Sequence, residues 1–307
     1  LQPFIAGLDT TNKKDISIRE MLAHHGGLVS WIPFYKNTID PLNKKRKALD
    51  SHYRMISNDS FNVQVANNLY MRKDFVDSVW NAIIISDLRE NTNYKYSDLG
   101  FYFMMRVIEE QSNMSLDKYT DMSFYKPLGL HQTGFNPRLF YDLKDIVPSE
   151  KDNYFRNQII QGYVHDMGAA MLGGVSGHAG LFSSALDLGV IMQMLLNGGY
   201  YGGREYFKPK TVLEFTKRFG ESTRRALGFD MKELNEARYE NMSDRASEKT
   251  FGHLGFTGTC AFVDPENDLV YVLLSNRTYP TMVNNRFGRK NFRPRIQSVI
   301  YSAIKNP

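Results

Sequence analysis

The stretch HLGFTGTCAFVDPENDLVYVLLSN, residues 253–276, contains two short runs of β-branched and aromatic residues around the sequence DPEND at 264–268. Such runs on either side of turn-forming residues predict an antiparallel hairpin. Gly255 and Gly258 stand at the entrance to the first run. Because glycine has no side chain, a ligand can lie along the backbone there and bind main-chain N–H groups. A simple turn before the strand is the alternative interpretation of this glycine pair.

Helical periodicity dominates the chain before about residue 220. Ser17 and Glu20 have the spacing of a capping box at the start of the helix predicted for SIREMLAHHGG. In NYKYSDLGFYFMMRVIEE, residues 93–110, apolar residues recur at helical spacing after Ser97 and Asp98, and either of these two suits the N-cap. Further helices are predicted at 115–124, 184–197, 208–219 and 293–305.

The predicted elements form a helical block followed by a block of strands, which the terminal helix can cover. No Pro- or Ser-rich linker divides the two blocks. The glycine-rich residues 162–183 predict irregular chain. Because the glycines at 173–180 are not followed by the Lys-Ser/Thr of a phosphate loop, close packing is the better interpretation of them.

Composition indicates a globular chain of about one to three domains, with 307 residues, 42% of them hydrophobic and 23% charged. The net charge of +5 is concentrated in two clusters, Lys44–Lys47 and the arginine-rich residues 286–295. Neither cluster forms a regular basic stripe on a helix, so a solvated surface is favoured over a nucleic-acid-binding one.

The single cysteine, Cys260, excludes an internal disulfide and has the sequence context of a small buried apolar residue. No apolar run is long enough to span a membrane. The chain opens on Leu1 without an initiator Met or the charged region of a signal peptide, so we expect this to be an internal point of a longer product.

The histidines do not predict a metal site. His24, His25, His165 and His178 have no recognised ligand spacing, and neither H-E-x-x-H nor paired C-x-x-C occurs. We therefore expect no metal and no cofactor.

The sequence YSD at 96–98 contains a candidate for acid–base chemistry. A tyrosine can act as a general base where cations or hydrogen bonds lower its pKa from about 10.

Three motifs in order resemble those of serine β-lactamase-related hydrolases, the group of class C β-lactamases, DD-peptidases and family VIII esterases. ISIREMLAHHGGL is similar to their I-T-I-R-x-L-L-x-H-x-S-G-L segment, YSDLGF to their Tyr-x-Asn motif, and HLGFTGT to their Lys/His-x-Gly motif. VHDMGAAMLGGVSGHAGLFSSALDL and NRTYP resemble a subgroup often fused behind a family 3 glycoside hydrolase in Bacteroidetes.

The resemblance implies an α+β fold of the β-lactamase/transpeptidase type, in which helices flank an antiparallel sheet beside a helical region. One domain would cover residues 1–307, with 16–219 mainly helical and 220–307 forming the strands and the C-terminal helix. The family's N-terminal strands and Ser-x-x-Lys helix are not in this chain. An exposed sheet edge and an uncovered core face are therefore expected unless another segment supplies these elements.

The resemblance also implies roles for individual residues. Tyr96 takes the place of the base or proton relay, and Asp98 takes that of the asparagine that contacts the substrate. His253 stands where the family has a cation. The remaining implied site residues are Gly255, which keeps the strand open, the N–H of Phe256 as an oxyanion donor, and Thr257 and Trp31 as substrate contacts.

The nucleophilic serine is not evident. In the family, Ser-x-x-Lys precedes the I-T-I-R segment by several tens of residues, so we expect it upstream of Leu1. Two internal matches occur, at 115–118 and 302–305. Ser115 is better placed as an N-cap, and Ser302 lies at the C-terminal, negative end of a predicted helix, where an alkoxide is disfavoured. Ser97 is interpreted as a helix cap or a link between its two neighbours.

The functional hypothesis is a serine hydrolase that transfers the acyl group of an ester, an amide or a D-amino-acid peptide through an acyl-serine intermediate. The alternative is a non-catalytic module that binds cell-wall fragments. The resemblance further implies an extracytoplasmic location, a small-molecule or peptide substrate, and an upstream glycoside hydrolase domain in the same product.

Overall fold

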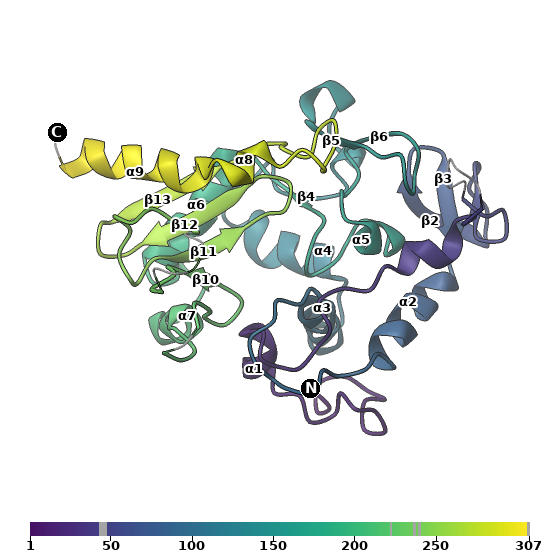
Figure 1. The fold of residues 1–307 in the computed structure, drawn as a ribbon, viewed down its shortest axis with the longest axis horizontal. Coiled ribbons are helices and arrows are strands. Elements are labelled where there is room, and N and C mark those ends of the chain that lie inside the picture. The colour runs from purple at the N-terminus through teal and green to yellow at the C-terminus, as the bar shows by residue number, and fades with distance from the viewer. Residues whose placement is uncertain (43–47, 222, 236–237, 239–240, 306–307) are drawn as a thin grey trace. The chain divides into compact units, whose positions relative to one another are not determined.

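Internal contacts divide the chain into two units in the computed structural model, which describes residues 1–42, 48–221, 223–235, 238 and 241–305 (Figure 1). Unit 1 comprises Leu1–Met122, Gly134–Phe182 and Tyr279–Thr281, and unit 2 comprises Ser123–Thr133, Ser183–Thr278 and Met282–Pro307. The predicted internal boundary at residue 219 does not coincide with this division. The basic cluster Lys44–Lys47 lies outside the described residues.

Unit 1 is mainly helical, with short two- and three-stranded sheets. Its helices are α1 (Ile18–Leu22), α2 (Phe75–Ile84), α3 (Leu99–Ser112), α4 (Leu116–Thr120) and α5 (Met167–Met171), with 3-10 turns at Phe34–Thr38, Pro137–Leu139 and Leu143–Asp145. Its strands are β1 (Tyr53–Arg54), β2 (Phe61–Ala66), β3 (Leu69–Arg72), β4 (Gly134–Phe135), β5 (Pro148–Lys151), β6 (Ile159–Gln161) and β7 (Leu181–Phe182).

The sheets of unit 1 are antiparallel and pair in the order β1-β3-β2, β4-β7 and β5-β6. A π-helical turn at Asp121–Tyr125 follows α4.

Unit 2 contains α6 (Ala185–Leu196), β8 (Tyr200–Tyr201), β9 (Arg204–Glu205), α7 (Pro209–Thr216), β10 (Asp230–Met231), β11 (Phe251–Leu254), β12 (Cys260–Asp264), β13 (Leu269–Leu273), α8 (Arg286–Arg289) and α9 (Phe292–Lys305).

The predicted hairpin forms strands β12 and β13, at one side of the antiparallel sheet β10-β11-β12-β13 (Figure 1). All five residues of β12 are buried, and successive side chains point to opposite faces of the sheet. Ala261 and Val263 pack with Met192 of α6, whereas Cys260 and Phe262 pack with Tyr301 of α9. The expectation of an uncovered face is therefore wrong for this sheet, because α6 and α9 cover both sides of β12.

The predicted helices are confirmed, with shorter bounds for α1, α4, α6 and α7, whereas α3 and α9 match their predicted ranges to within two residues. Ser17 and Ser115 occupy N-cap positions, but neither makes a side-chain cap hydrogen bond, so the capping box is not formed. Ser184 does cap α6, because its hydroxyl accepts from the N–H of Asp187 at 3.2 Å. The prediction of irregular chain at 162–183 is wrong in part, because Asp166 accepts from the N–H of Ala169 and starts α5.

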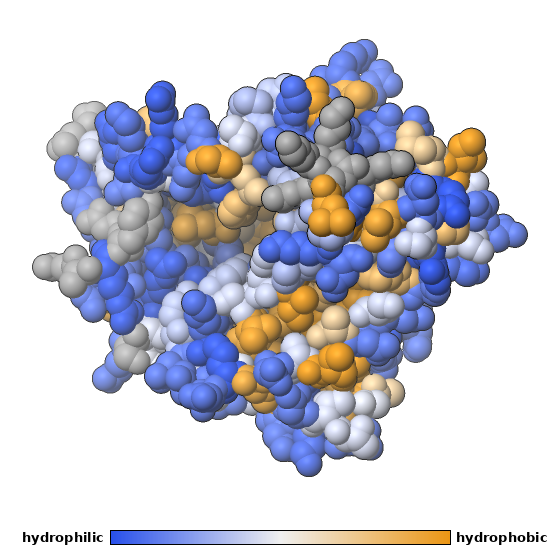
Figure 2. All heavy atoms as spheres, turned by 45° about the vertical axis from the view of Figure 1, so that its right-hand side comes forward, coloured by the Kyte–Doolittle hydropathy of each residue, from blue (hydrophilic) through white to orange (hydrophobic). Residues whose placement is uncertain are grey.

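Apolar side chains also reach the surface of the folded chain. On the face drawn in Figure 2 they form several separate groups among hydrophilic residues. Single exposed apolar residues are ordinary in folded proteins, since polar groups are too few to cover the whole surface. Among the strands that the structure describes, β13 pairs only with β12, and the expectation of an exposed sheet edge stays a prediction.

Asp264 organises the end of the hairpin. Its carboxylate accepts hydrogen bonds from the hydroxyl of Ser247 at 2.7 Å, the side-chain amide of Asn267 at 2.8 Å and the hydroxyl of Tyr301 at 2.5 Å. Burial alone raises the pKa of this carboxyl, but the hydrogen bonds outweigh burial and lower the pKa to about 2. The ionised form of Asp264 therefore stabilises the fold of unit 2.

We predict that Asp264→Asn lowers the free energy of unfolding by about 2–3 kcal/mol at pH 7, because charge-assisted hydrogen bonds are lost. The pKa is lower in the folded than in the unfolded state, so the contribution of Asp264 is complete above about pH 4 and is lost as pH falls toward about 2. Urea unfolding of the two proteins at pH 7 and at about pH 2 measures the effect. Asp268→Asn is the matched control, since Asp268 is exposed in the same turn and has φ 47°, which asparagine tolerates.

Candidate active site

The predicted site residues fall into two groups, one in each unit. Unit 1 contains Trp31, Tyr96 and Asp98, and unit 2 contains His253 and the turn at 255–258. Within unit 1, the main-chain N–H of Asp98 donates to the carbonyl of Ser30 at 3.0 Å. This bond holds the YSD sequence against the loop that contains Trp31. Trp31 is 40% exposed, with its ring 6.5 Å from that of Tyr35.

Ser97 is used internally. Its side chain is buried, and its hydroxyl donates to the carbonyl of Val29 at 2.7 Å and accepts from the N–H of Leu99 at 3.2 Å. Asp98 holds the N-cap position of α3 but makes no side-chain cap bond. The hydroxyl of Ser97 therefore connects the start of α3 to the preceding loop, whereas the N-cap position itself is held by Asp98.

His24 supports Tyr96, a role that the sequence analysis missed. The N–H of Ser97 donates to Nδ1 of His24 at 3.2 Å, and the imidazole lies 4.4 Å from the ring of Tyr96 at an interplanar angle of 37°. Because Nδ1 accepts, the neutral imidazole carries its proton on Nε2. His24 has φ 62° where α1 ends before Gly26 and Gly27, and this left-handed geometry turns its ring toward the YSD sequence.

A second pair of polar residues adjoins Asp98. Nε2 of His178 lies 2.8 Å from Oδ1 of Asp166, and Nδ1 lies 2.9 Å from the hydroxyl of Ser176. The ring of Tyr102 from α3 stacks on His178 at 4.2 Å. Of these residues, His178 was weighed from the sequence only as a metal ligand. The sequence signal for this cluster was its position, since Asp166 and His178 stand on either side of the glycine-rich segment.

The two carboxyl groups of this cluster are shifted in opposite directions. Burial raises the pKa of Asp98, and the charge of Asp166 raises it further, against the lowering effects of His178 and of a hydrogen bond with Tyr96. For Asp166, burial also raises the pKa, but His178 and the N–H of Ala169 outweigh burial and leave the pKa below its usual value. A pair with divergent pKa values suits acid–base chemistry, with Asp166 ionised and Asp98 the more readily protonated.

The glycines of unit 1 confirm close packing. A Cβ at Gly168 would lie 2.1 Å from the hydroxyl oxygen of Tyr102, and one at Gly177 would lie 2.2 Å from the carbonyl oxygen of Phe101. Side chains at these positions would push the polar cluster away from α3. The glycines thus bring Asp166 and His178 toward Tyr102, rather than cradling a phosphate.

In unit 2 the Gly255–Gly258 pair forms a turn between β11 and β12. The N–H of Gly255 donates to the carbonyl of Thr259 at 2.8 Å, and that of Gly258 donates to the carbonyl of Gly255 at 3.1 Å. A Cβ at Gly255 would lie 2.0 Å from the hydroxyl of Thr259. The simple-turn interpretation is therefore what the geometry shows, and a substrate contact at Gly255 stays a prediction.

The two central residues of this turn are held by the segment after β13. Phe256 is 62% exposed, with the guanidinium of Arg277 lying 4.5 Å from its ring centroid. The N–H of Arg277 donates to the carbonyl of Thr257 at 2.9 Å. These contacts fix the turn from outside the sheet. The roles of Phe256 as an oxyanion donor and of Thr257 as a substrate contact stay predictions.

His253 on β11 is neutral rather than cationic. Its Nδ1 lies 2.8 Å from the carbonyl of Leu254, and its Nε2 lies 3.5 Å from Nη1 of Arg225. Burial lowers the pKa of His253 from its usual value of 6.5, and Arg225 lowers it further. A lowered pKa favours the uncharged imidazole, and a role for His253 in the place of the family's cation stays a prediction.

Neither internal Ser-x-x-Lys match has the surroundings of a nucleophile. Ser115 is exposed at the start of the five-residue helix α4. Ser302 lies in α9, and its hydroxyl donates to the carbonyl of Ser298 at 2.9 Å. A hydroxyl that donates within its own helix is not activated by a neighbouring base.

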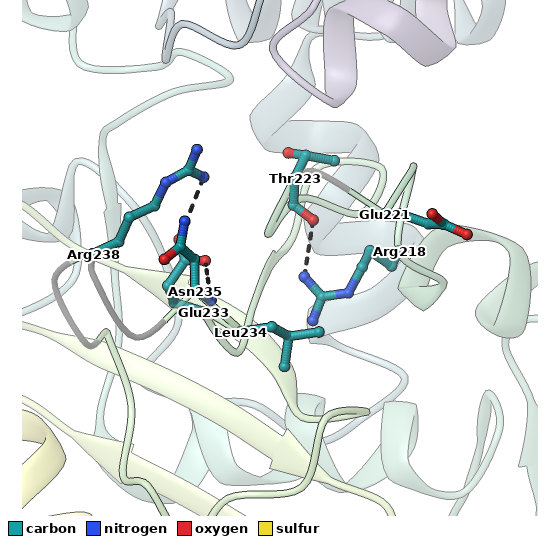
Figure 3. Close-up of a pocket in the computed structure, with 7 residues that line it drawn as sticks. All are labelled: Arg218, Glu221, Thr223, Glu233, Leu234, Asn235 and Arg238. Carbon is teal, nitrogen blue, oxygen red and sulfur yellow. Dashed lines mark hydrogen bonds and ion pairs between the residues drawn. The ribbon is translucent and has the colours of Figure 1, made fainter.

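A separate polar pocket of about 270 Å³ lies in unit 2 (Figure 3). It is lined by Arg218, Glu221, Thr223, Glu233, Leu234, Asn235 and Arg238. Arg218 donates to the carbonyl of Thr223 at 2.8 Å, and Arg238 lies 3.8 Å from a carboxylate oxygen of Glu233. The pocket contains none of the predicted site residues, so it is not the candidate site.

In the part of the chain that the structure describes, no three His, Cys, Asp or Glu side chains are grouped to hold a metal ion. No helix among the described residues is long and apolar enough to cross a membrane.

Comparisons with known proteins agree with the class that the motifs indicate. The family model described as Beta-lactamase matches residues 3–290. A protein of Salmonella gallinarum named "Putative D-alanyl-D-alanine carboxypeptidase" is 37% identical over 218 residues, which are 67% of this chain and 50% of the relative. This chain therefore belongs to the beta-lactamase family, and it spans about half the length of the curated relatives that it matches.

Solved structures support the same fold. A penicillin-binding protein homologue from Caulobacter crescentus is 15% identical, with a TM-score of 0.56 over 88% of this chain and 67% of that one. A mutant simvastatin synthase from Aspergillus terreus is 14% identical, with a TM-score of 0.56 over 95% of this chain and 70% of that one. The expected β-lactamase/transpeptidase-like fold of helices and antiparallel sheets is confirmed.

We predict that Ser97→Ala lowers the free energy of unfolding by about 1–2 kcal/mol, because a buried donor and a buried acceptor both lose a partner. Urea unfolding measures the change. Ser115→Ala is the control, and an exposed serine without a side-chain cap bond should change stability by less than about 0.5 kcal/mol. Equal effects of the two substitutions would contradict the structural role of Ser97.

Proposed function

We propose that the protein is a serine hydrolase that transfers the acyl group of an ester, an amide or a D-amino-acid peptide. The observation that carries the proposal is the pairing of Tyr96 with Asp98 at the start of α3, in a chain that belongs to the beta-lactamase family. The carboxypeptidase name of the Salmonella relative supports a peptide ending in D-alanine as one substrate class. An extracytoplasmic location would fit such a substrate.

The proposed reaction has two steps. A serine hydroxyl attacks the acyl carbon, Tyr96 takes up the hydroxyl proton and passes a proton to the leaving group, and the bond between the acyl carbon and that group breaks. Water then attacks the acyl-serine and releases the acid, which regenerates the serine. In unit 2, the N–H of Phe256 would stabilise the oxyanion that forms in each step. The nucleophile is not assigned to Ser97, Ser115 or Ser302. The glycoside hydrolase companion stays a prediction.

The alternative function is a non-catalytic module that binds cell-wall fragments. The surroundings of Ser115 and Ser302 favour this alternative for the described residues, because neither serine is activated. The two functions differ in one observable, since only a hydrolase forms a covalent adduct with a fluorophosphonate or a fluorescent penicillin.

We predict that Tyr96→Phe lowers nitrophenyl-ester hydrolysis by about 100-fold or more and abolishes covalent labelling, because the proton relay is lost. The assay uses a protein that includes any sequence the gene encodes before Leu1. Tyr94→Phe is the matched control, since this neighbour also packs against His24 and has no proposed role. Covalent labelling that is equally strong in the Tyr96 variant would contradict the relay, and absence of labelling in the unaltered protein would favour the binding module.

We predict that Asp98→Asn retains hydrolysis and removes a decline at higher pH. The pKa of Asp98 is raised, so its neutral acid form, which resembles the family's amide in offering a donor, is present below that pKa and is lost as pH rises through it. The groups that act on this carboxyl are Tyr96, His178 and Asp166. The profile of kcat/KM against pH measures the effect. A loss of more than about 10-fold at every pH in the Asn variant would show that the carboxylate is needed.

A further inference from the structure

Three charged residues, Arg224, Arg225 and Asp230, lie near the side chain of His253, and backbone pairing positions two of them. In the sheet of unit 2, Asp230 of β10 pairs with Gly252 of β11, the residue before His253 (Figure 1). A β-bridge joins Arg225 to Asp230 across a short turn. The register of these strands, rather than flexible side chains, therefore places the guanidinium of Arg225 beside the imidazole.

The contacts of the imidazole define its tautomer. A carbonyl can only accept, so the 2.8 Å contact with Leu254 requires a proton on Nδ1. An arginine can only donate, so the 3.5 Å contact between Nε2 and Arg225 requires a lone pair on Nε2. This distance is at the outer limit of a hydrogen bond, and the contact is mainly electrostatic. A proton added to Nε2 would point at a positive charge.

The charges behind the imidazole do not cancel. Oδ1 of Asp230 lies 3.1 Å from Nε of Arg224 and 3.5 Å from Nη1 of Arg225. The side chains of Arg225 and Asp230 are buried, and that of Arg224 is mostly so. The side chains of Arg224, Arg225 and Asp230 together carry one positive charge. Around them, Arg218 also interacts with Asp230, and Glu233 and Glu248 act on Arg218.

We propose that Arg225 is a positioning residue that holds His253 as the neutral Nδ1–H tautomer, and that the cluster of Arg224, Arg225 and Asp230 supplies the positive charge which the family motif assigns to residue 253. The second half of this inference rests on the proposed function, whereas the first half does not. Nε2 of His253 then presents a lone pair rather than a proton, and the positive charge lies on the arginines beside the imidazole.

Electrostatics agree with this assignment. Burial makes the largest contribution to the lowered pKa of His253, and Arg225 and Arg224 lower it further. Asp230 and the hydrogen bond with the carbonyl of Leu254 act in the opposite direction. The imidazole is therefore neutral above its lowered pKa and gains a proton only as pH falls through that value.

The first test is the nitrogen NMR spectrum of the histidine side chains in the 15N-labelled chain, recorded between about pH 5 and pH 8, where an ordinary histidine titrates. His253→Gln assigns the resonances by their loss. We expect His253 to show a protonated Nδ1 and an unprotonated Nε2 at pH 7, and to titrate at a lower pH than an ordinary histidine. A proton on Nε2 at pH 7 would overturn the proposal, and the tautomer itself is measured on the unaltered chain.

The second test removes the charge. Arg225→Met should raise the pKa of His253 by about one pH unit toward 6.5, Arg225→Lys should leave it within a few tenths, and the exposed-arginine control Arg204→Met should not change it. An unchanged pKa in the folded Met variant would overturn the positioning role. If the Met variant does not fold, Asp230→Asn provides the second case. Loss of that negative charge should lower the pKa of His253, and a raised value would contradict the cluster.

The catalytic half of the inference is tested in the hydrolysis assay. Arg225→Met should reduce kcat by about 10-fold or more, with Arg225→Lys restoring most of it, because the charge rather than the fork geometry is needed. Retention of full kcat in the Met variant would overturn the electrostatic role. A protein with the expected NMR tautomer but no covalent labelling would refute the proposed function alone, so the two failures are distinguishable.

Discussion

The buried carboxylate of Asp264 is the interaction on which unit 2 depends most. It ends β12, accepts from Asn267 in the hairpin turn, from Ser247 before β11 and from Tyr301 of the last helix. A carboxylate can accept several hydrogen bonds at once, and no other ionised side chain serves that purpose as compactly. Because the same residue fixes the turn and docks α9, it also fixes the register of β11 and β12, and with it the positions of His253 and the following turn.

Burial controls the chemistry of both groups of site residues. In unit 1, burial raises the pKa of Asp98 while hydrogen bonds keep Asp166 ionised. In unit 2, burial keeps His253 neutral and leaves the positive charge on arginines behind it. At both motif positions, Asp98 and His253, burial favours the neutral form of the side chain. The charge is carried by neighbours that the motif does not include, Asp166 in unit 1 and the arginines in unit 2. Motif identity alone therefore does not reveal the charge distribution.

The sequence was sufficient for elements with strong periodicity. The hairpin, α3, α6 and α9 were predictable because their apolar residues repeat at the period of their own structure. The sheet β1-β3-β2 and α2 were missed although signals exist: residues alternate in β2, Asn67 and Asn68 form a turn, and Val79 and Ile83 share the buried face of α2.

By itself, the sequence determined the family, the order of the main helices and strands, and the residues that occupy the motif positions, because these depend on residue type and spacing along the chain. Only the tertiary structure decided which hydroxyl of YSD is engaged, which carboxyl stays ionised, and which tautomer His253 adopts. Those properties depend on partners distant in the sequence, such as Val29 for Ser97 and Arg225 for His253. A side chain's pKa and hydrogen bonds are set by what burial brings next to it, and no local pattern specifies that neighbour.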